Sequence, residues 1–224
     1  MFDPLRITAY LQCGVESDWT LPIDAILYYQ AMRKKFGAQD VTVSGGYATK
    51  KSLKAAMPLR IVNQGLDTWF YSASFAQWEL GRVEGSDHWN KRFDQTLVDL
   101  VDFSGRRGRV VVEQGQYRAY HMPIFYRHAV SVSWYVVGDG DAVSELLRFV
   151  DCIGKKSSQG WGAVLRWNVE TCPGDWSVRG DGGKLMRALP ADDSRQYTSR
   201  LIYTGFRPSY WHRKNQTMCE MPNE

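Results

Sequence analysis

The chain has 224 residues, of which 44% are hydrophobic and 23% are charged, and its formal net charge is +4 at pH 7. This length suits one large domain or a domain with a sizeable insertion, and the hydrophobic share supports a packed core. We expect a cytoplasmic protein without a membrane span, since no apolar run reaches spanning length and no signal pattern opens the chain. The four cysteines lie far apart, which predicts reduced thiols and no structural zinc.

The first third of the sequence predicts a strand followed by a helix. Residues 5–15 are typical of a strand, and a helix is indicated from about residue 21 to Gly37. Thr20 suits the N-cap, Pro22 suits the first helical position, and Asp24 favours the positive end of the helix dipole. Gly37 is a natural residue just beyond the last turn. The apolar face of this helix comprises Ile23, Ile26, Leu27 and Ala31.

The middle of the chain mixes loops, short strands and charge. Residues 38–57 are polar and rich in glycine, serine and lysine, which predicts a long exposed loop of the kind that is often functional. Residues 59–62 and 67–75 predict the two strands of a hairpin. Residues 77–101 carry spaced apolar positions among charges, with a helix near their end. Further on, a turn is predicted at 104–108 and strands at 109–113 and 126–137.

A second helix and a last strand flank a glycine-rich loop. The helix is predicted over residues 142–152 with Asp141 as its cap, the loop over 153–164, and the strand over 163–170. Apolar residues recur at helical spacing at Val143, Leu146, Leu147 and Val150.

Without an insertion at about 76–108, the order of elements is β-α-β-β-α-β. This order predicts an α+β, ferredoxin-like (RRM-like) core in residues 1–170. Residues 171–224 form a loop-rich C-terminal extension, which we expect to pack on that core.

The glycine-rich loop is the first candidate binding site. Its glycines allow the backbone to turn sharply and to approach a ligand closely, while its lysines, hydroxyls and amide offer hydrogen-bond donors. It lacks the Gly-x-x-x-x-Gly-Lys-Ser/Thr pattern of a P-loop. Two adjacent ammonium groups are costly to bury, so they need solvent or a phosphate as a partner. Trp161 could stack on a base or pack the loop onto the core. The candidate residues are Lys155, Lys156, Ser157, Ser158, Gln159, Gly160 and Trp161.

Other basic clusters fall on predicted loops or at a strand. Any one of them is most simply a solvated charged surface. Together with nine tryptophans and twelve tyrosines, they favour a surface that binds nucleic acid. Arg166 and Trp167 alternate along the last strand, so one of the two should face solvent or RNA. The additional candidates are Lys50, Lys51, Lys54, Lys91, Arg92, Arg106, Arg107 and Arg166.

Catalytic and metal-binding patterns are not found in the sequence. The four histidines (His88, His121, His128 and His212) lack metal-ligand spacing, and no Gly-x-Ser-x-Gly elbow occurs. We therefore predict no cofactor, no metal and no catalytic residue.

The succession of helix, Gly/Lys/Ser loop, Gly-Trp-Gly and strand resembles the glycine-rich loop of the RAMP superfamily, the repeat-associated RNA-binding proteins of CRISPR systems. Residues 21–27, Leu-Pro-Ile-Asp-Ala-Ile-Leu, resemble a helix start in RAMP subunits that cap the 5′ repeat handle of a guide RNA. Residues 187–190 and 207–211 are similar to the Arg-x-x-Pro and Pro-Pro-Tyr-Trp elements of the small RAMP subunit in type IV effector complexes.

This resemblance implies a ferredoxin-like fold and a function as a non-catalytic subunit that binds the crRNA 5′ handle and caps the backbone of the complex. It also implies partners: the crRNA, a backbone RAMP subunit, a large subunit, and target DNA nearby. Insertions in RAMP subunits often form a thumb that wedges between guide nucleotides, and 76–108 is the matching segment.

Two other functions stay open from the sequence. The first is a metal-independent endoribonuclease that processes the precursor crRNA. Several RAMP nucleases place a histidine on or near the first helix, and residues 5–37 contain none. Tyr28, Lys34 and Lys35 could still form a histidine-free site. The second is a general single-stranded nucleic-acid binding module outside CRISPR.

Overall fold

The computed structural model of the chain describes residues 1–37, 55–100, 111, 113–114, 117–192 and 199–223. Most of the predicted loop at 38–57 and the turn at 104–108 lie outside these residues, as does most of the predicted strand at 109–113. The same is true of five candidate site residues, namely Lys50, Lys51, Lys54, Arg106 and Arg107.

The largest element is a four-stranded sheet in which neighbouring strands are antiparallel. Its strands are β1 (Asp3–Leu11), β4 (Gln77–Lys91), β5 (Tyr120–Gly138) and β6 (Val164–Thr171), in the order β4-β5-β1-β6. The predicted strands at 126–137 and 163–170 are confirmed, although β5 begins six residues earlier than expected. The chain is thus a mixed α/β protein built on antiparallel pairing.

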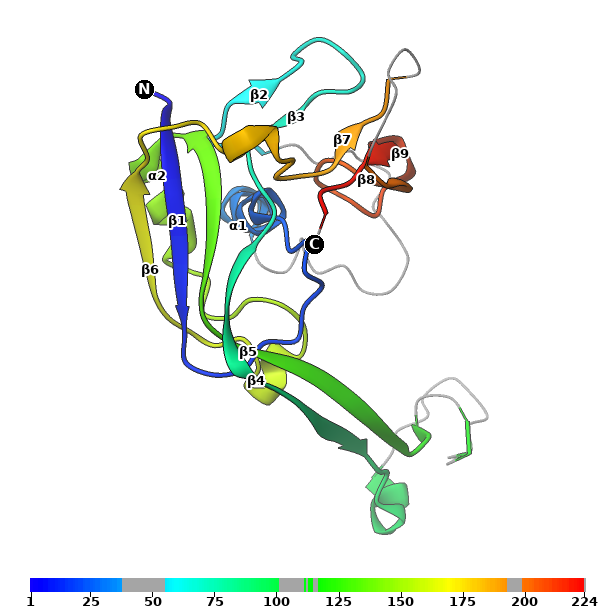
Figure 1. Cartoon of the computed structure of the whole chain (residues 1–224). Helices are drawn as coiled ribbons and strands as arrows, with labels where there is room; N and C mark the ends of the chain where they lie inside the picture. Colours follow the sequence, from blue (N-terminus) through cyan, green and yellow to red (C-terminus); the bar gives the residue numbers. More distant parts are fainter. Residues whose placement is uncertain (38–54, 101–110, 112, 115–116, 193–198, 224) are drawn as a thin grey trace.

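Two helices cover one face of this sheet, behind the strands in the view of Figure 1. They are α1 (Ile23–Phe36) and α2 (Gly140–Leu147). Alternate residues of β1, such as Ile7, point into the core between the sheet and the helices and are fully buried. The next residue on β1, Thr8, shares a 3.1 Å hydrogen bond with Ser133 on the other face of the sheet.

Both helix starts differ from the prediction. Pro22 is the N-cap of α1 in extended conformation, with no side-chain hydrogen bond, so Thr20 precedes the cap instead of forming it. The start of α2 is capped by Asp139, whose carboxylate accepts a hydrogen bond from the Ala142 amide at 3.0 Å. Asp141 lies in the first turn, because the helix begins two residues earlier than expected. Gly37 does end α1, with a φ of 85°.

The segment expected as an insertion at about 76–108 is partly a strand of the sheet. The first residues of β4 pair with the central part of β5 (Gln77 opposite Ser133), and its last residues pair with the start of β5 (Lys91 opposite Tyr120). The helix expected near residue 101 is the 3-10 turn η1 (Gln95–Leu100). Beyond the sheet, β4 and β5 continue as a two-stranded ribbon, residues 85–91 and 120–126, which we call the arm (Figure 1).

The predicted hairpin is confirmed, as β2 (Ile61–Val62) and β3 (Phe70–Tyr71), paired antiparallel. After β6 the chain forms a smaller three-stranded sheet in the order β7-β9-β8, from β7 (Leu189–Pro190), β8 (Leu201–Gly205) and β9 (Gln216–Glu220). Short 3-10 turns lie at Ser157–Gln159 (η3), Asp181–Gly183 (η4) and Arg213–Asn215 (η5).

A second buried cluster joins the C-terminal sheet to the rest of the molecule. Phe70 and Phe75, which precede β4, pack with Phe206, Cys219 and other residues of the C-terminal part. Within the described part of the chain, no helix combines the length and the hydropathy needed to span a membrane.

Candidate nucleic-acid interface

The glycine-rich loop is a closed turn between α2 and β6. Ile153 donates its backbone N–H to the carbonyl of Gly162 at 2.9 Å, and Cys152 pairs with Ala163 in a β-bridge. Gly154, Gly160 and Gly162 all have positive φ, between 72° and 89°. A Cβ at Gly162 would lie 1.9 Å from the carbonyl oxygen of Ile153, so this turn needs glycine there.

The segment after β1 holds the loop in place. The amide of Gly162 donates to the carbonyl of Gly14 at 2.8 Å, and the amide of Lys155 donates to the carbonyl of Glu16 at 2.7 Å. Backbone hydrogen bonds to residues far away in sequence therefore fix the position of the loop backbone, and with it the Cα atoms that carry the two lysine side chains.

Each lysine of the loop has a partner within the protein. The Lys155 ammonium lies 3.3 Å from the Asp18 carboxylate, and both side chains are more than half exposed. The Lys156 ammonium lies 4.3 Å from the centroid of the Trp89 ring on the arm. An exposed ion pair contributes about 0–1 kcal/mol, and an exposed cation–π contact about 0.5–1 kcal/mol. A phosphate could therefore replace either partner at low cost.

The rest of the loop presents polar groups to solvent. Ser157, Ser158, Gln159 and Gly160 are all exposed in and beside η3. Trp161 is half-buried and stacks on Tyr126 of the arm, with ring centroids 4.4 Å apart and planes 27° from parallel. The structure thus gives Trp161 a packing contact, the second of the two roles that the sequence left open.

The loop contacts one face of the arm. Alternation along β4 and β5 places Trp89, Ile124 and Tyr126 on that face, and Ile124 is only 2% exposed. The opposite face carries His88 and His121, whose rings stack 4.3 Å apart.

Phe125 lies on that opposite face as well and is 72% exposed. The candidate residues Lys91 and Arg92 lie at the far end of the arm and are exposed. The arm therefore brings two aromatic rings, those of Trp89 and Tyr126, to the loop.

Arg166 lies near the start of β6, on the face of the sheet without helices. Its guanidinium carbon is 3.9 Å from the centroid of the Tyr10 ring. Trp167 points to the other face, where it donates to the Val150 carbonyl at 2.8 Å and packs near Trp134. Of the two alternating residues, Arg166 is thus the one that faces outward.

Sequence reasoning missed a buried ionic cluster formed by the very motifs that carried the resemblance. Asp24 at the start of α1 and Arg187 before β7 are both fully buried, and their nearest charged atoms lie 3.6 Å apart. Tyr210 donates its hydroxyl to Asp24 at 2.7 Å. Arg187 also donates to the carbonyls of Tyr71 and Ala73.

Burial raises the pKa of the Asp24 carboxyl, more than the Arg187 guanidinium and the Tyr210 hydroxyl lower it. Among the described residues, its second oxygen has no hydrogen-bond partner. The same environment raises the pKa of the Tyr210 hydroxyl well above its ordinary value. These groups hold α1 against the C-terminal part, and a spacing pattern could not have revealed that they meet.

The residues weighed for a histidine-free nuclease site have other contacts. The Lys34 ammonium forms an ion pair with Glu145 of α2 at 2.7 Å, and burial raises the pKa of the Tyr28 hydroxyl. The Lys35 ammonium lies 5.1 Å from the centroid of the Phe36 ring. No group of three His, Cys, Asp or Glu within the described ranges could hold a metal ion.

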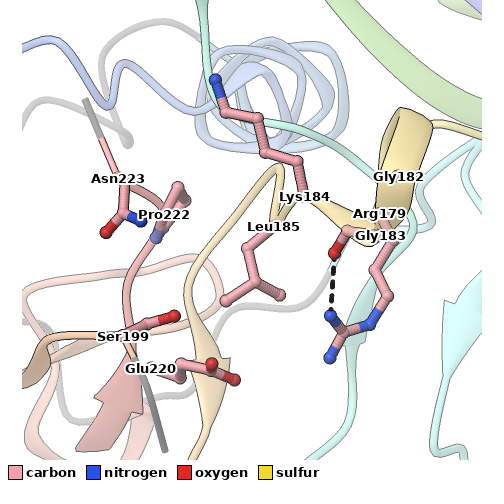
Figure 2. Close-up of a pocket in the computed structure, with 9 residues that line it drawn as sticks. All are labelled: Arg179, Gly182, Gly183, Lys184, Leu185, Ser199, Glu220, Pro222 and Asn223. Atoms are coloured by element: carbon pink, nitrogen blue, oxygen red, sulfur yellow. Dashed lines mark hydrogen bonds between the residues drawn. The ribbon is translucent and has the colours of Figure 1, made fainter.

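A cleft with two compartments lies in the C-terminal part, and its second compartment also borders the start of β4. Its polar compartment, about 330 Å³, is lined by Arg179, Lys184, Ser199 and Glu220 among others. Figure 2 shows Lys184 pointing away from Glu220, while Arg179 donates to the carbonyl of Gly183 at 3.1 Å. A second, aromatic compartment of about 270 Å³ adjoins it, since Lys184, Leu185, Pro222 and Asn223 line both.

These features define an antiparallel α/β protein whose exposed basic loop contacts one face of an aromatic arm. A family model described as the CRISPR type IV associated protein Csf3 matches residues 3–222. The chain therefore belongs to this family of type IV CRISPR-associated proteins. A search of curated proteins finds no match to the chain.

Proposed function

We propose that the protein is a non-catalytic RNA-binding subunit of a type IV CRISPR effector ribonucleoprotein. In this role it holds the 5′ repeat-derived handle of the crRNA and caps one end of the backbone. The observation that carries the proposal is the glycine-rich loop, which presents Lys155, Lys156 and two serine hydroxyls at the protein surface in a chain of this family. Lysines and hydroxyls on loops are typical ligands of nucleic-acid phosphates.

The proposal includes a ferredoxin-like RAMP core. In chain order, the strands of the main sheet and the helices that cover it run β1, α1, β4, β5, α2 and β6. The sheet order β4-β5-β1-β6 places one antiparallel strand between the two strands that each helix connects, which is the split β-α-β arrangement. In this reading β4 takes the place that the sequence suggested for the hairpin at 59–75.

We assign the proposed core to residues 1–170 and treat 171–224 as an extension that packs on it. The shared cluster of Phe70 and Phe75 with Phe206 supports that packing. The proposed partners are the crRNA, a backbone RAMP subunit and a large subunit, with target DNA nearby. The arm is the element best suited to reach a neighbour, because it extends beyond the sheet (Figure 1).

The first test replaces Lys155 and Lys156 with alanine and measures how the affinity for a labelled single-stranded handle RNA depends on salt. Each lysine that neutralises a phosphate releases counterions and contributes about 0.7 to the slope of log K against log salt. The double variant should bind more weakly, with a slope flatter by roughly one to one and a half units.

Lys34 and Lys35 provide the matched control, since they are also adjacent and lie on α1. Their double alanine variant should keep the slope of the wild type. An unchanged slope in the loop variant would place the loop off the RNA path. Specific cleavage of repeat RNA without metal, lost on changing Tyr28 or Lys34, would favour the nuclease instead.

A further inference from the structure

We propose that the aromatic compartment of the C-terminal cleft binds one unstacked base of the guide RNA. This inference rests on the proposed function and adds a base-binding site to it. The compartment is lined by the aromatic residues Trp19, Phe75 and Trp78, which we call its floor, and by polar residues that include Gln77, Arg127 and Lys184, which we call its rim.

The floor is a rigid aromatic surface. Trp19 packs edge-on against Phe75 with ring centroids 6.2 Å apart, and the Trp78 indole donates to the Trp19 carbonyl at 2.9 Å. Phe75 is buried, whereas both tryptophans are half-buried and keep part of their surface open. Aromatic rings held in this way can stack with a base at little cost in conformational entropy.

The rim favours an anionic ligand with hydrogen-bonding edges. Arg127 and Lys184 contribute two cations, and Gln77 and Asn223 contribute amides, which can pair with the edge of a base. None of the lining residues that the structure describes is acidic. A volume of about 270 Å³ is close to the lower end of ligand sites, roughly 300–1,000 Å³, which suits one nucleotide better than a helix or a folded segment.

The compartment adjoins the segment that holds the glycine-rich loop. Trp19 directly follows Asp18, the ion-pair partner of Lys155. Arg127 exchanges two backbone hydrogen bonds with Val15, at 2.9 and 3.0 Å. If the phosphates of an RNA strand lie on the glycine-rich loop, a base of an adjacent nucleotide would therefore be within reach of the two tryptophans.

The test combines variants of the protein with single abasic substitutions along a fluorescein-labelled handle RNA. In the wild type, one abasic position should weaken binding roughly 5- to 150-fold, the range expected for the loss of one stacked base. In the Trp78→Leu variant, the abasic substitution at that same position should weaken binding only slightly, because the ring on which the base stacks is already absent.

Lys184→Ala provides a second variant that should fold normally, because the Lys184 side chain is exposed and does not pack against the aromatic floor. It should weaken binding of intact RNA and flatten the salt slope by about 0.7. Trp211→Leu is the matched control, because Trp211 is 57% exposed and does not line the cleft. It should behave like the wild type.

The proposal is overturned if every abasic position costs the same in wild type and Trp78→Leu while Lys184→Ala binds normally. The proposed function would survive that result, since the loop would still bind RNA. Loss of a protein partner from the Trp78→Leu complex, with RNA binding intact, would assign the cleft to that protein instead. Failure of the wild type to bind any handle RNA would refute the proposed function itself.

Discussion

Asp24 and Arg187 show that residues of a sequence motif can have a structural role instead of a binding role. Both belong to stretches that resemble RAMP subunits, yet both side chains are fully buried and face each other. Breaking a buried pair by removing one member is strongly destabilising, because the remaining charge has no partner. At this scale the motifs describe how the chain folds, and the candidate RNA contacts lie on other residues.

The raised pKa of Asp24 predicts how stability changes with pH. In the unfolded chain this carboxyl should titrate near 4, so the folded protein binds the proton more tightly than the unfolded chain. The contribution of Asp24 is therefore fully present below pH 4 and is lost as the pH rises through the raised pKa. Urea unfolding from pH 4 to 8 should show that the wild type loses stability relative to Asp24→Asn over this window.

Below pH 4 the Asp24 carboxyl is protonated and carries no charge, like an asparagine side chain, so the wild type and Asp24→Asn should differ little in stability there. As the pH rises, the wild type should become less stable than the variant, because its carboxyl must ionise in a buried site. A wild type that instead gains stability over the variant as the pH rises would mean that the Arg187 guanidinium dominates over burial and that the pKa of Asp24 is lowered.

Among the elements, the regular ones were predictable and the arm was not. The helices α1 and α2 carry apolar residues at helical spacing because one face of each packs on the sheet. The distal half of β4 has no such pattern, since a two-stranded ribbon outside the sheet has no core to face. Its sequence, from Gly85 to Lys91, therefore reads as a charged insertion and forms a strand through pairing with β5.

The candidate site was predictable in its residues and not in their partners. Three glycines beside Lys155 and Lys156 indicated an exposed loop, and the loop is exposed. The contacts of these lysines with Asp18 and Trp89 join residues far apart in sequence, so no local pattern could reveal them. The cleft likewise joins residues from both ends of the chain.

Two glycines of the loop allow a matched test of its geometry. Gly160 and Gly162 both have positive φ, but a Cβ at Gly160 meets nothing within 4 Å. Gly160→Ala should therefore cost only the backbone strain of about 1–2 kcal/mol. Gly162→Ala should cost more and weaken RNA binding as well, because the Ile153 carbonyl must move. Thermal unfolding and RNA titration of both variants measure the losses of stability and of RNA affinity. Equal losses in the two variants would contradict the prediction.

At the scale of the whole molecule, two buried arginines connect segments that lie far apart in the sequence. Arg187 donates to carbonyls before β4 and to the Phe206 carbonyl after β8. Arg207 donates to the carbonyls of Asp67 and Trp69 at 2.8 and 3.1 Å. The C-terminal part is thus tied to the hairpin β2–β3 and to α1 by two buried arginine side chains.

These ties predict that the core and the C-terminal part unfold together. Arg187→Met should lower the free energy of unfolding by about 3–5 kcal/mol, because it leaves Asp24 and several carbonyls without their partner. Amide hydrogen exchange should show equal losses of protection in β1 and β9. Arg200→Met, a change at an exposed arginine of the same part, should leave both unchanged. Lost protection in β9 alone would mean that the two parts unfold separately.

The reach of the arm is set by the geometry of its two strands. β5 runs for 19 residues without interruption, from the far end of the arm along almost the whole length of β1, a span of about 60 Å at roughly 3.3 Å per residue. Adding two residues to each of its strands would carry the tip about 7 Å further while the same face still met the glycine-rich loop. Adding one residue would turn Trp89 and Tyr126 away from the loop and present the histidine face to it. Related chains can therefore change the reach of this arm freely only in steps of two residues.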